Sequence, residues 1–153
     1  MTTPVQHNLG DIRLQRSLTL PNDVETIPEL NVFIDSVAEE IGLDMSLTMS
    51  LNLAIEEAVV NVMEYAYPQG EQGNVIIDVT ATDQWLQFVL TDCGTPFDPT
   101  KKKEADTTLS AEERPIGGLG IFLVRQLMDS IEYAYKDGKN VLTLKKQLTT
   151  QPQ

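Results

Sequence analysis

Residues 55–68 read IEEAVVNVMEYAYP and lie in the clearest helical pattern of the chain. Apolar residues recur there at intervals of three or four positions, which predicts an amphipathic helix. Either Asp44 or Ser46 can cap the start of this helix, and Pro68 and Gly70 terminate it. Its apolar positions are Leu47, Leu51, Ile55, Ala58 and Val62.

Glu57 and Asn61 stand four positions apart in this stretch, so their side chains share one face of the helix. Taken alone, the pair is also what an ordinary amphipathic helix carries at the border of its apolar face. Asparagine, however, is a mediocre helix former and has no capping role in mid-helix. A neutral oxygen ligand beside a carboxylate is what a hydrated Mg²⁺ ion with bound phosphates requires.

The segments on either side predict further strands and helices. An alternating pattern in 11–20 predicts a strand that ends in a turn at Pro21, and helical spacing from Ile27 to Ile41 predicts a helix that Gly42 closes. After the central helix, one predicted hairpin of apolar strands is followed later by a second, which turns at Asp137-Gly138. The four strands cover 74–81, 85–91, 130–135 and 140–147, and a third helix with Ile121, Val124, Arg125 and Met128 spaced on it precedes the last pair.

Strands and helices come in blocks rather than in strict β–α alternation, which predicts an α+β fold. We expect a two-layer α/β sandwich, in which a mostly antiparallel mixed sheet carries about three helices on one face. The length of 153 residues fits one domain. We assign that domain to 11–147, with flexible tails at 1–10 and 148–153.

Composition excludes several classes of function. The 11 basic and 23 acidic residues leave a net charge of −12, which repels phosphate backbones, so we expect no nucleic-acid partner. No apolar run is long enough to span a bilayer, and the first residues lack the pattern of a signal peptide. The single Cys93 and the single His7 give neither an intramolecular disulfide nor a metal cluster. These features predict a cytoplasmic protein that does not enter a membrane.

A second polar segment, DCGTPFD at 92–98, directly follows an apolar strand. A carboxylate at a strand end, such as that of Asp92, can accept a hydrogen bond from an exocyclic amine like that of adenine. Gly94 would let the backbone come close to a flat ring. Because Asp, Gly and Pro are common in turns, an ordinary turn is the alternative interpretation.

A third segment, RPIGGLGI at 114–121, is a glycine-rich entry into the third helix. Free amides at a helix N-terminus bind phosphate oxygens readily. The segment is neither a P-loop nor a Rossmann fingerprint, and tight helix packing can also demand small residues. Between the second and third segments, a long polar stretch is typical of a functional lid.

Together, an E-x-x-x-N helix, a D-x-G strand end, a long lid and a G-x-G helix start resemble the ATPase superfamily of gyrase, Hsp90, the MutL repair proteins and the histidine kinases. The resemblance runs from about Leu47 to Lys146. The short chain and the segment EEAVVNVMEYAYP at 56–68 look most like the bacterial anti-sigma-factor serine/threonine kinases. The resemblance therefore implies a Bergerat-type ATP-binding fold.

For the individual residues, the resemblance implies an ATP site with Mg²⁺. Asn61 would coordinate the metal, and Glu57 matches the general base that takes a proton from a serine hydroxyl or a water. Asp92 would bind the adenine amino group, with Gly94 leaving room for the ring.

The resemblance also implies that the amides around Gly118, Leu119 and Gly120 hold the phosphates and that 98–117 forms the ATP lid. Arg114 is a candidate contact to the γ-phosphate. The chain departs from the family near the start of the last strand. Asn140 or Val141 stands there in place of the usual threonine, so a substitute adenine contact is needed.

The function implied is that of an ATP-dependent kinase that phosphorylates a small antagonist, a STAS-type protein with a target serine, and also sequesters a sigma factor. An alternative is a non-catalytic or weakly catalytic ATP-binding switch that binds a protein partner. A partner of a serine phosphatase and a purely structural domain are further alternatives. Relatives form homodimers through the early strand and helix, so a homodimer is expected here too.

Overall fold

The computed structural model describes residues 11–101 and 120–148, and the predicted two-layer α+β fold is confirmed there. The tails 1–10 and 149–153 and most of the predicted lid lie outside the described residues. The elements are β1 (Leu14–Pro21), η1 (Val24–Thr26), α2 (Ile27–Ile41), α3 (Met45–Tyr65), β2 (Asn74–Ala81), β3 (Trp85–Asp92), η2 (Pro99–Lys101), α4 (Gly120–Leu127), β4 (Ser130–Lys136) and β5 (Lys139–Gln147).

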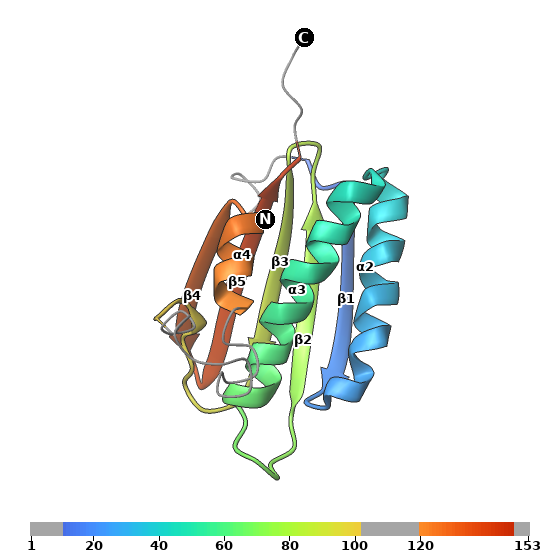
Figure 1. The fold of residues 1–153 in the computed structure, drawn as a ribbon. Helices are drawn as coiled ribbons and strands as arrows, with labels where there is room; N and C mark the ends of the chain where they lie inside the picture. The colour runs from blue at the N-terminus through green and yellow to red at the C-terminus, as the bar shows by residue number, and fades with distance from the viewer. Residues whose placement is uncertain (1–10, 102–119, 149–153) are drawn as a thin grey trace, which may run out of the picture.

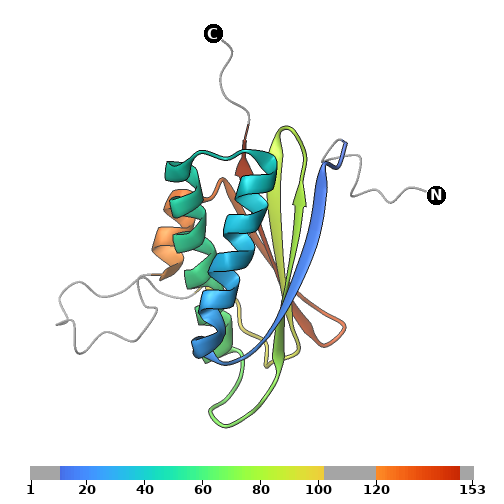
Figure 2. The same ribbon diagram turned by 90° about the vertical axis from the view of Figure 1, so that its right-hand side faces the viewer.

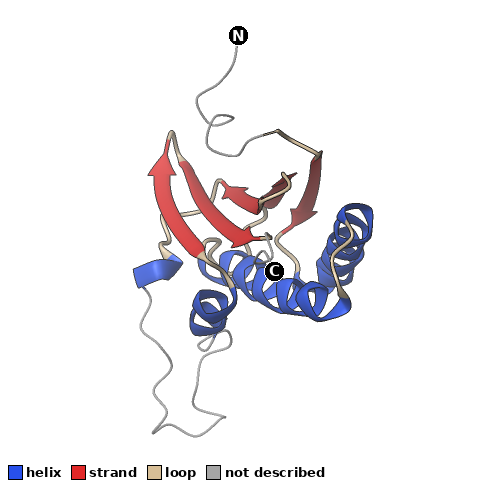
Figure 3. Ribbon diagram, turned by 90° about the horizontal axis from the view of Figure 1, so that it is seen from above, coloured by secondary structure: helices blue, strands red, loops and turns tan. Residues whose placement is uncertain are grey.

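The five strands form one sheet in the order β1-β2-β3-β5-β4, and each neighbouring pair is antiparallel. Figure 1 shows α2, α3 and α4 side by side in front of this sheet. The side view in Figure 2 and the view from above in Figure 3 place all three helices on the same face of a twisted sheet.

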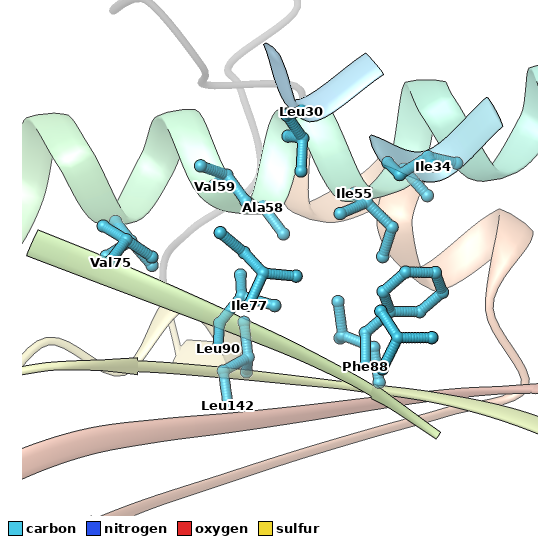
Figure 4. Close-up of a cluster of buried hydrophobic side chains, with 14 of the residues drawn as sticks. Leu30, Ile34, Ile55, Ala58, Val59, Val75, Ile77, Phe88, Leu90 and Leu142 are labelled. Atoms are coloured by element: carbon cyan, nitrogen blue, oxygen red, sulfur yellow. The ribbon is translucent and has the colours of Figure 1, made fainter. Parts of the chain in front are cut away.

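The core lies between the helices and the sheet because the strands alternate inward and outward residues. In β3, Leu86, Phe88 and Leu90 are fully buried while the residues between them are partly exposed. Figure 4 shows Phe88 and Leu90 of β3 below Ile55 of α3 and Ile34 of α2. The inward face of β3 continues to Asp92, so this alternation carries a carboxylate to the edge of the apolar core.

The predicted helix signals are largely confirmed. Gly42 follows α2 with φ 78°, the left-handed conformation that favours glycine at a helix end. Asp44, rather than Ser46, caps α3, since its Oδ1 accepts a hydrogen bond from the Leu47 N–H at 2.7 Å. The β4–β5 turn forms at Asp137 and Gly138, with φ values of 55° and 77°.

The structure corrects some predicted boundaries. β1 begins at Leu14 rather than at residue 11, and Pro21 belongs to the strand, paired with Asn74, instead of ending it. β1 is an edge strand, where the N–H that proline lacks is not needed for the sheet. The N–H of Leu148, which the sequence places in a tail, donates to the Gln84 carbonyl at 2.7 Å. In the described ranges, no helix is long and apolar enough to cross a membrane.

Candidate nucleotide-binding site

The candidate residues gather at one end of the two layers. In Figure 1 the C-terminal end of α3 and the end of β3 lie toward the lower end of the molecule, and α4 begins at its own lower end, beside α3. α3 also packs directly against α4. The fold therefore brings together the three sequence segments that suggested a nucleotide, as far as the structure describes them.

Asn61 provides an oxygen that no described residue satisfies. Its side chain is 1% exposed, and its Nδ2 donates to the carbonyl of Glu57, one turn earlier, at 2.9 Å. Its Oδ1 is buried and accepts no hydrogen bond from the described part of the chain. An unsatisfied buried acceptor costs about 1–3 kcal/mol, so a ligand that fills it gains that amount. Glu57 is half-buried on the same helix.

Asp92 provides a second such oxygen at the end of β3. The residue is 3% exposed, and its Oδ1 accepts from the Gly94 N–H at 2.8 Å and from Asn140 Nδ2 at 2.9 Å. Its Oδ2 is buried and has no hydrogen-bond partner among the described residues. Burial raises the pKa of this carboxyl above its usual value, and the hydrogen bonds from Asn140 and Gly94 oppose that rise only in part.

Asn140 stands directly across from Asp92 in the β3–β5 pairing and is also 3% exposed. The sequence placed it near the usual threonine but gave it no partner. The alternation of the strand could have indicated that Asn140 is buried. Asn140 lies two and four positions before the buried Leu142 and Leu144, so all three side chains face the same side of the sheet. A buried Asp–Asn pair therefore forms the end of the candidate site at β3 and β5.

Gly94 lies against the end of α3. A Cβ atom at this position would stand 2.3 Å from the carbonyl oxygen of Ala66, so a side chain does not fit. The same carbonyl accepts from the Thr95 N–H at 2.7 Å and from Thr95 Oγ1 at 3.0 Å. The ring of Phe97 stacks on that of Tyr65, with centroids 5.5 Å apart. The loop after β3 is thus fastened to the helix that carries Glu57 and Asn61.

The predicted phosphate-binding residues are described only at their last member. Gly120 is the first residue of α4, as expected for a glycine at a helix start, while Arg114, Gly118 and Leu119 lie outside the described residues. The described start of the predicted lid contains the short helix η2. Arg125 of α4 donates from Nη2 to the carbonyl of Thr100 in that helix.

The donor set fits ATP with Mg²⁺. A buried amide oxygen is a hard ligand of the kind that Mg²⁺ accepts alongside phosphates and water. A buried carboxylate oxygen without a donor is suited to an amino group on a flat base.

Comparison with known proteins agrees with this geometry. The sequence profile of the histidine kinase-like ATPase domain matches residues 20–146. The serine-protein kinase RsbW of Listeria monocytogenes is 30% identical over 133 residues, which cover 84% of this chain and 85% of that protein. RsbW of Bacillus pumilus is 27% identical over 134 residues, covering 84% and 83% of the two chains.

A solved structure of the RsbU and RsbW domains of a Mycobacterium tuberculosis protein shares the fold, with a TM-score of 0.64 at 18% identity. The match covers 90% of this chain and 33% of that longer chain. With the profile match over most of its length and the 30% identity to RsbW, the chain belongs to the anti-sigma-factor serine/threonine kinases of the histidine kinase-like ATPase family.

Proposed function

We propose that this protein is an ATP-dependent anti-sigma factor with serine/threonine kinase activity, which phosphorylates a small antagonist protein and sequesters a sigma factor. The observation that carries the proposal is a pair of buried oxygens at one end of the fold, Asn61 Oδ1 and Asp92 Oδ2, which have no hydrogen-bond partner among the described residues. Family membership supports the use of ATP. Asn61 Oδ1 would bind the metal that accompanies the phosphates, and Asp92 Oδ2 would bind the base.

Asp92 and Asn61 bind rather than react in this account. Asp92 Oδ2 accepts a hydrogen bond from the amino group of adenine, while Gly94 keeps the loop close to α3. Asn61 Oδ1 would hold Mg²⁺, because its Nδ2 already donates to the Glu57 carbonyl and this bond fixes the direction of the amide. Bound MgATP supplies the phosphoryl group and the metal charge that neutralises its oxygens.

Glu57 is the proposed general base. It is half-buried one turn before Asn61, so its carboxylate is carried by the same rigid helix as the metal ligand. Its role is to accept the proton of the serine hydroxyl on the antagonist as that oxygen becomes the nucleophile. We propose in addition that the amides of Gly118, Leu119 and Gly120 hold phosphate oxygens and that Arg114 contacts the γ-phosphate.

The proposed protein partners are a sigma factor and a STAS-type antagonist with a target serine. The sequence contains no lysine, arginine or histidine between Arg16 and Lys101, a range that includes both α2 and α3. α2 and α3 therefore present acidic side chains that suit a basic protein surface and repel nucleic acid. A homodimer in the cytoplasm completes the proposal.

A phosphotransfer assay tests the kinase activity. The protein is incubated with ATP labelled on its γ-phosphate, Mg²⁺ and purified STAS-type antagonists, and label on serine is measured. We expect transfer by the wild type and a loss of about 100-fold or more in Glu57→Gln, in line with the usual contribution of a general base. Glu56→Gln is the matched control, because Glu56 is the preceding residue of the same helix and accepts a hydrogen bond from Asn31 at 3.2 Å.

Two results would contradict the kinase proposal. Equal transfer by wild type and Glu57→Gln would remove Glu57 as the base. ATP binding without transfer to any antagonist tested would instead support the non-catalytic ATP switch.

A further inference from the structure

Every hydrogen-bonding group of the Asn140 side chain is engaged within the protein. Its Nδ2 donates to Asp92 Oδ1 at 2.9 Å and to the Thr95 carbonyl at 2.8 Å. Its Oδ1 accepts from the Phe97 N–H at 3.0 Å and from the hydroxyl of Tyr133. A primary amide has two donor hydrogens and two acceptor lone pairs, so no group is left for a ligand.

These contacts fix the orientation of the Asp92 carboxylate. Asn140 and the Gly94 N–H both donate to Oδ1, so turning the carboxylate out of this orientation would break two hydrogen bonds. Oδ2 is left as the one buried oxygen of Asp92 with no donor among the described residues. The direction in which Asp92 can accept a hydrogen bond is therefore set by Asn140 together with Gly94.

The same amide also fastens the loop to the two layers. Thr95 and Phe97, which Asn140 holds by their backbone, are the residues that contact Ala66 and stack on Tyr65. One buried side chain of β5 thus ties the end of β3 to the end of α3. Phe97 immediately precedes the predicted lid, so the hydrogen bond from its N–H to Asn140 holds the residue from which that segment starts.

We infer that Asn140 is the positioning residue for adenine recognition, which aims Asp92 Oδ2 at the base and holds the loop after β3 without touching the nucleotide itself. The inference rests on the proposed ATP site and names the residue that gives that site its preference for a 6-amino purine. A direct adenine contact by residue 140, which the departure from the family pattern suggested, is not needed.

Base selectivity tests this role. The affinities of ATP and of inosine triphosphate, which carries an oxygen in place of the 6-amino group, are measured by calorimetry. In Asn140→Leu we expect the ratio of the two affinities to fall about tenfold or more, since Asp92 loses a charge-assisted bond that orients it. Asn140→Thr, whose hydroxyl can still donate to Asp92, should keep part of the selectivity.

The matched control is Thr82→Val, at the opposite end of β3. Thr82 is also buried, at 3% exposure, and holds the β2–β3 turn by accepting from the Gln84 and Trp85 N–H groups at 3.1 and 3.0 Å. It should leave the ATP-to-inosine triphosphate ratio unchanged. If Asn140→Leu weakens both nucleotides equally, the residue is merely structural and the inference is wrong.

A double-mutant comparison tests the claim that Asn140 acts through Asp92. In an Asp92→Ala background, Asn140→Leu should change the base selectivity no further, because the side chain that it positions is already absent. A full additional loss of selectivity would mean that Asn140 contacts the base directly, which contradicts the inference.

A readout without nucleotide separates this inference from the proposed function. Carbon NMR of the Asp92 carboxyl should show a higher pKa in Asn140→Leu than in the wild type, because the bond from Asn140 lowers it. The tyrosines that face Asp92, Tyr67 and Tyr133, both have raised pKa values and stay neutral over that range. If the wild type binds neither nucleotide, the proposed function fails. An unchanged Asp92 pKa overturns the inference.

Discussion

Asp92→Asn should stabilise the nucleotide-free protein and reverse its base preference. The carboxylate is 3% exposed, and its Oδ2 has no hydrogen-bond donor among the described residues. Burial raises the pKa of the carboxyl, which means that the charged form is disfavoured in the fold. A raised folded-state pKa gives a stabilising contribution that is complete below the unfolded pKa and is lost as pH rises through the folded value. At neutral pH the native carboxylate therefore costs stability.

The magnitude follows from what the substitution changes. The oxygen of the introduced amide can still accept from Gly94 and Asn140, while a neutral N–H₂ group replaces the charged oxygen that lacks a donor. A buried unsatisfied charged group costs more than a neutral one, so we expect a gain of about 1 kcal/mol at pH 7. That gain corresponds to a rise in Tm of about 2–4 °C for a domain of this size. The gain should shrink as the pH falls and the wild-type carboxyl takes up its proton.

The base preference should invert for a geometric reason. Gly94 and Asn140 both donate at the Oδ1 position, so the new amide must place its oxygen there and its nitrogen where Oδ2 was. That nitrogen and the amino group of adenine are both hydrogen-bond donors, so they cannot form a hydrogen bond with each other. We expect a loss of about 100-fold in ATP affinity and a gain for inosine triphosphate, whose 6-oxygen can accept the new bond.

Differential scanning calorimetry between pH 5 and 8 and isothermal titration with both nucleotides measure these effects. Asp78→Asn is the matched control, because Asp78 is exposed on the neighbouring strand β2 and should change neither quantity. A destabilised Asp92→Asn apoprotein at pH 7 would mean that the buried carboxylate does not cost stability, and an unchanged preference for ATP would mean that Asp92 does not select the base.

Three stability predictions follow from the packing, each measured by urea unfolding. Gly94→Ala should cost about 1–3 kcal/mol, because its Cβ would stand 2.3 Å from the Ala66 oxygen, and an unchanged midpoint would contradict that close approach. Asp44→Ala should cost about 1 kcal/mol through the lost cap of α3, and no cost would mean that the cap does not form in solution. Phe88→Ala should cost about 3–5 kcal/mol, since the ring is fully buried between the layers, and a cost below about 1 kcal/mol would place it outside the core.

Local patterns predict much of this fold because they depend on neighbouring residues. The three-to-four spacing around Ile55 gives α3, and Asp137-Gly138 gives the β4–β5 turn, since each signal lies within one element. Pro21 is the exception, because its place in β1 depends on β1 being at the edge of the sheet. Edge position is a property of the whole sheet and cannot be found in the local sequence.

The sequence predicts the candidate ligand-binding residues but not the hydrogen-bond partners that hold them in place. Asn61 and Asp92 could be found because each sits in a short motif. The bond from Asn140 to Asp92 joins positions 48 residues apart, and the bond from Thr95 to Ala66 joins positions 29 residues apart. These contacts depend on the register of β3 with β5 and on how α3 packs on the sheet. Neither can be predicted from a short segment of sequence. For Gly94, the sequence indicated that glycine leaves room for a base. The structure shows that glycine is also required because a Cβ atom would clash with the carbonyl oxygen of Ala66.

Asn61 and Asp92 are proposed to form the two ends of one nucleotide site. A calorimetric titration of ATP with Mg²⁺ and with EDTA tests the metal end of that site. It compares the wild type with Asn61→Ala and with Asn52→Ala, an asparagine of the same helix whose Nδ2 instead donates to Asp35 at 2.9 Å. We expect Mg²⁺ to tighten ATP binding in the wild type and in Asn52→Ala, and to have no effect in Asn61→Ala. Equal enhancement by Mg²⁺ in all three proteins would contradict the account.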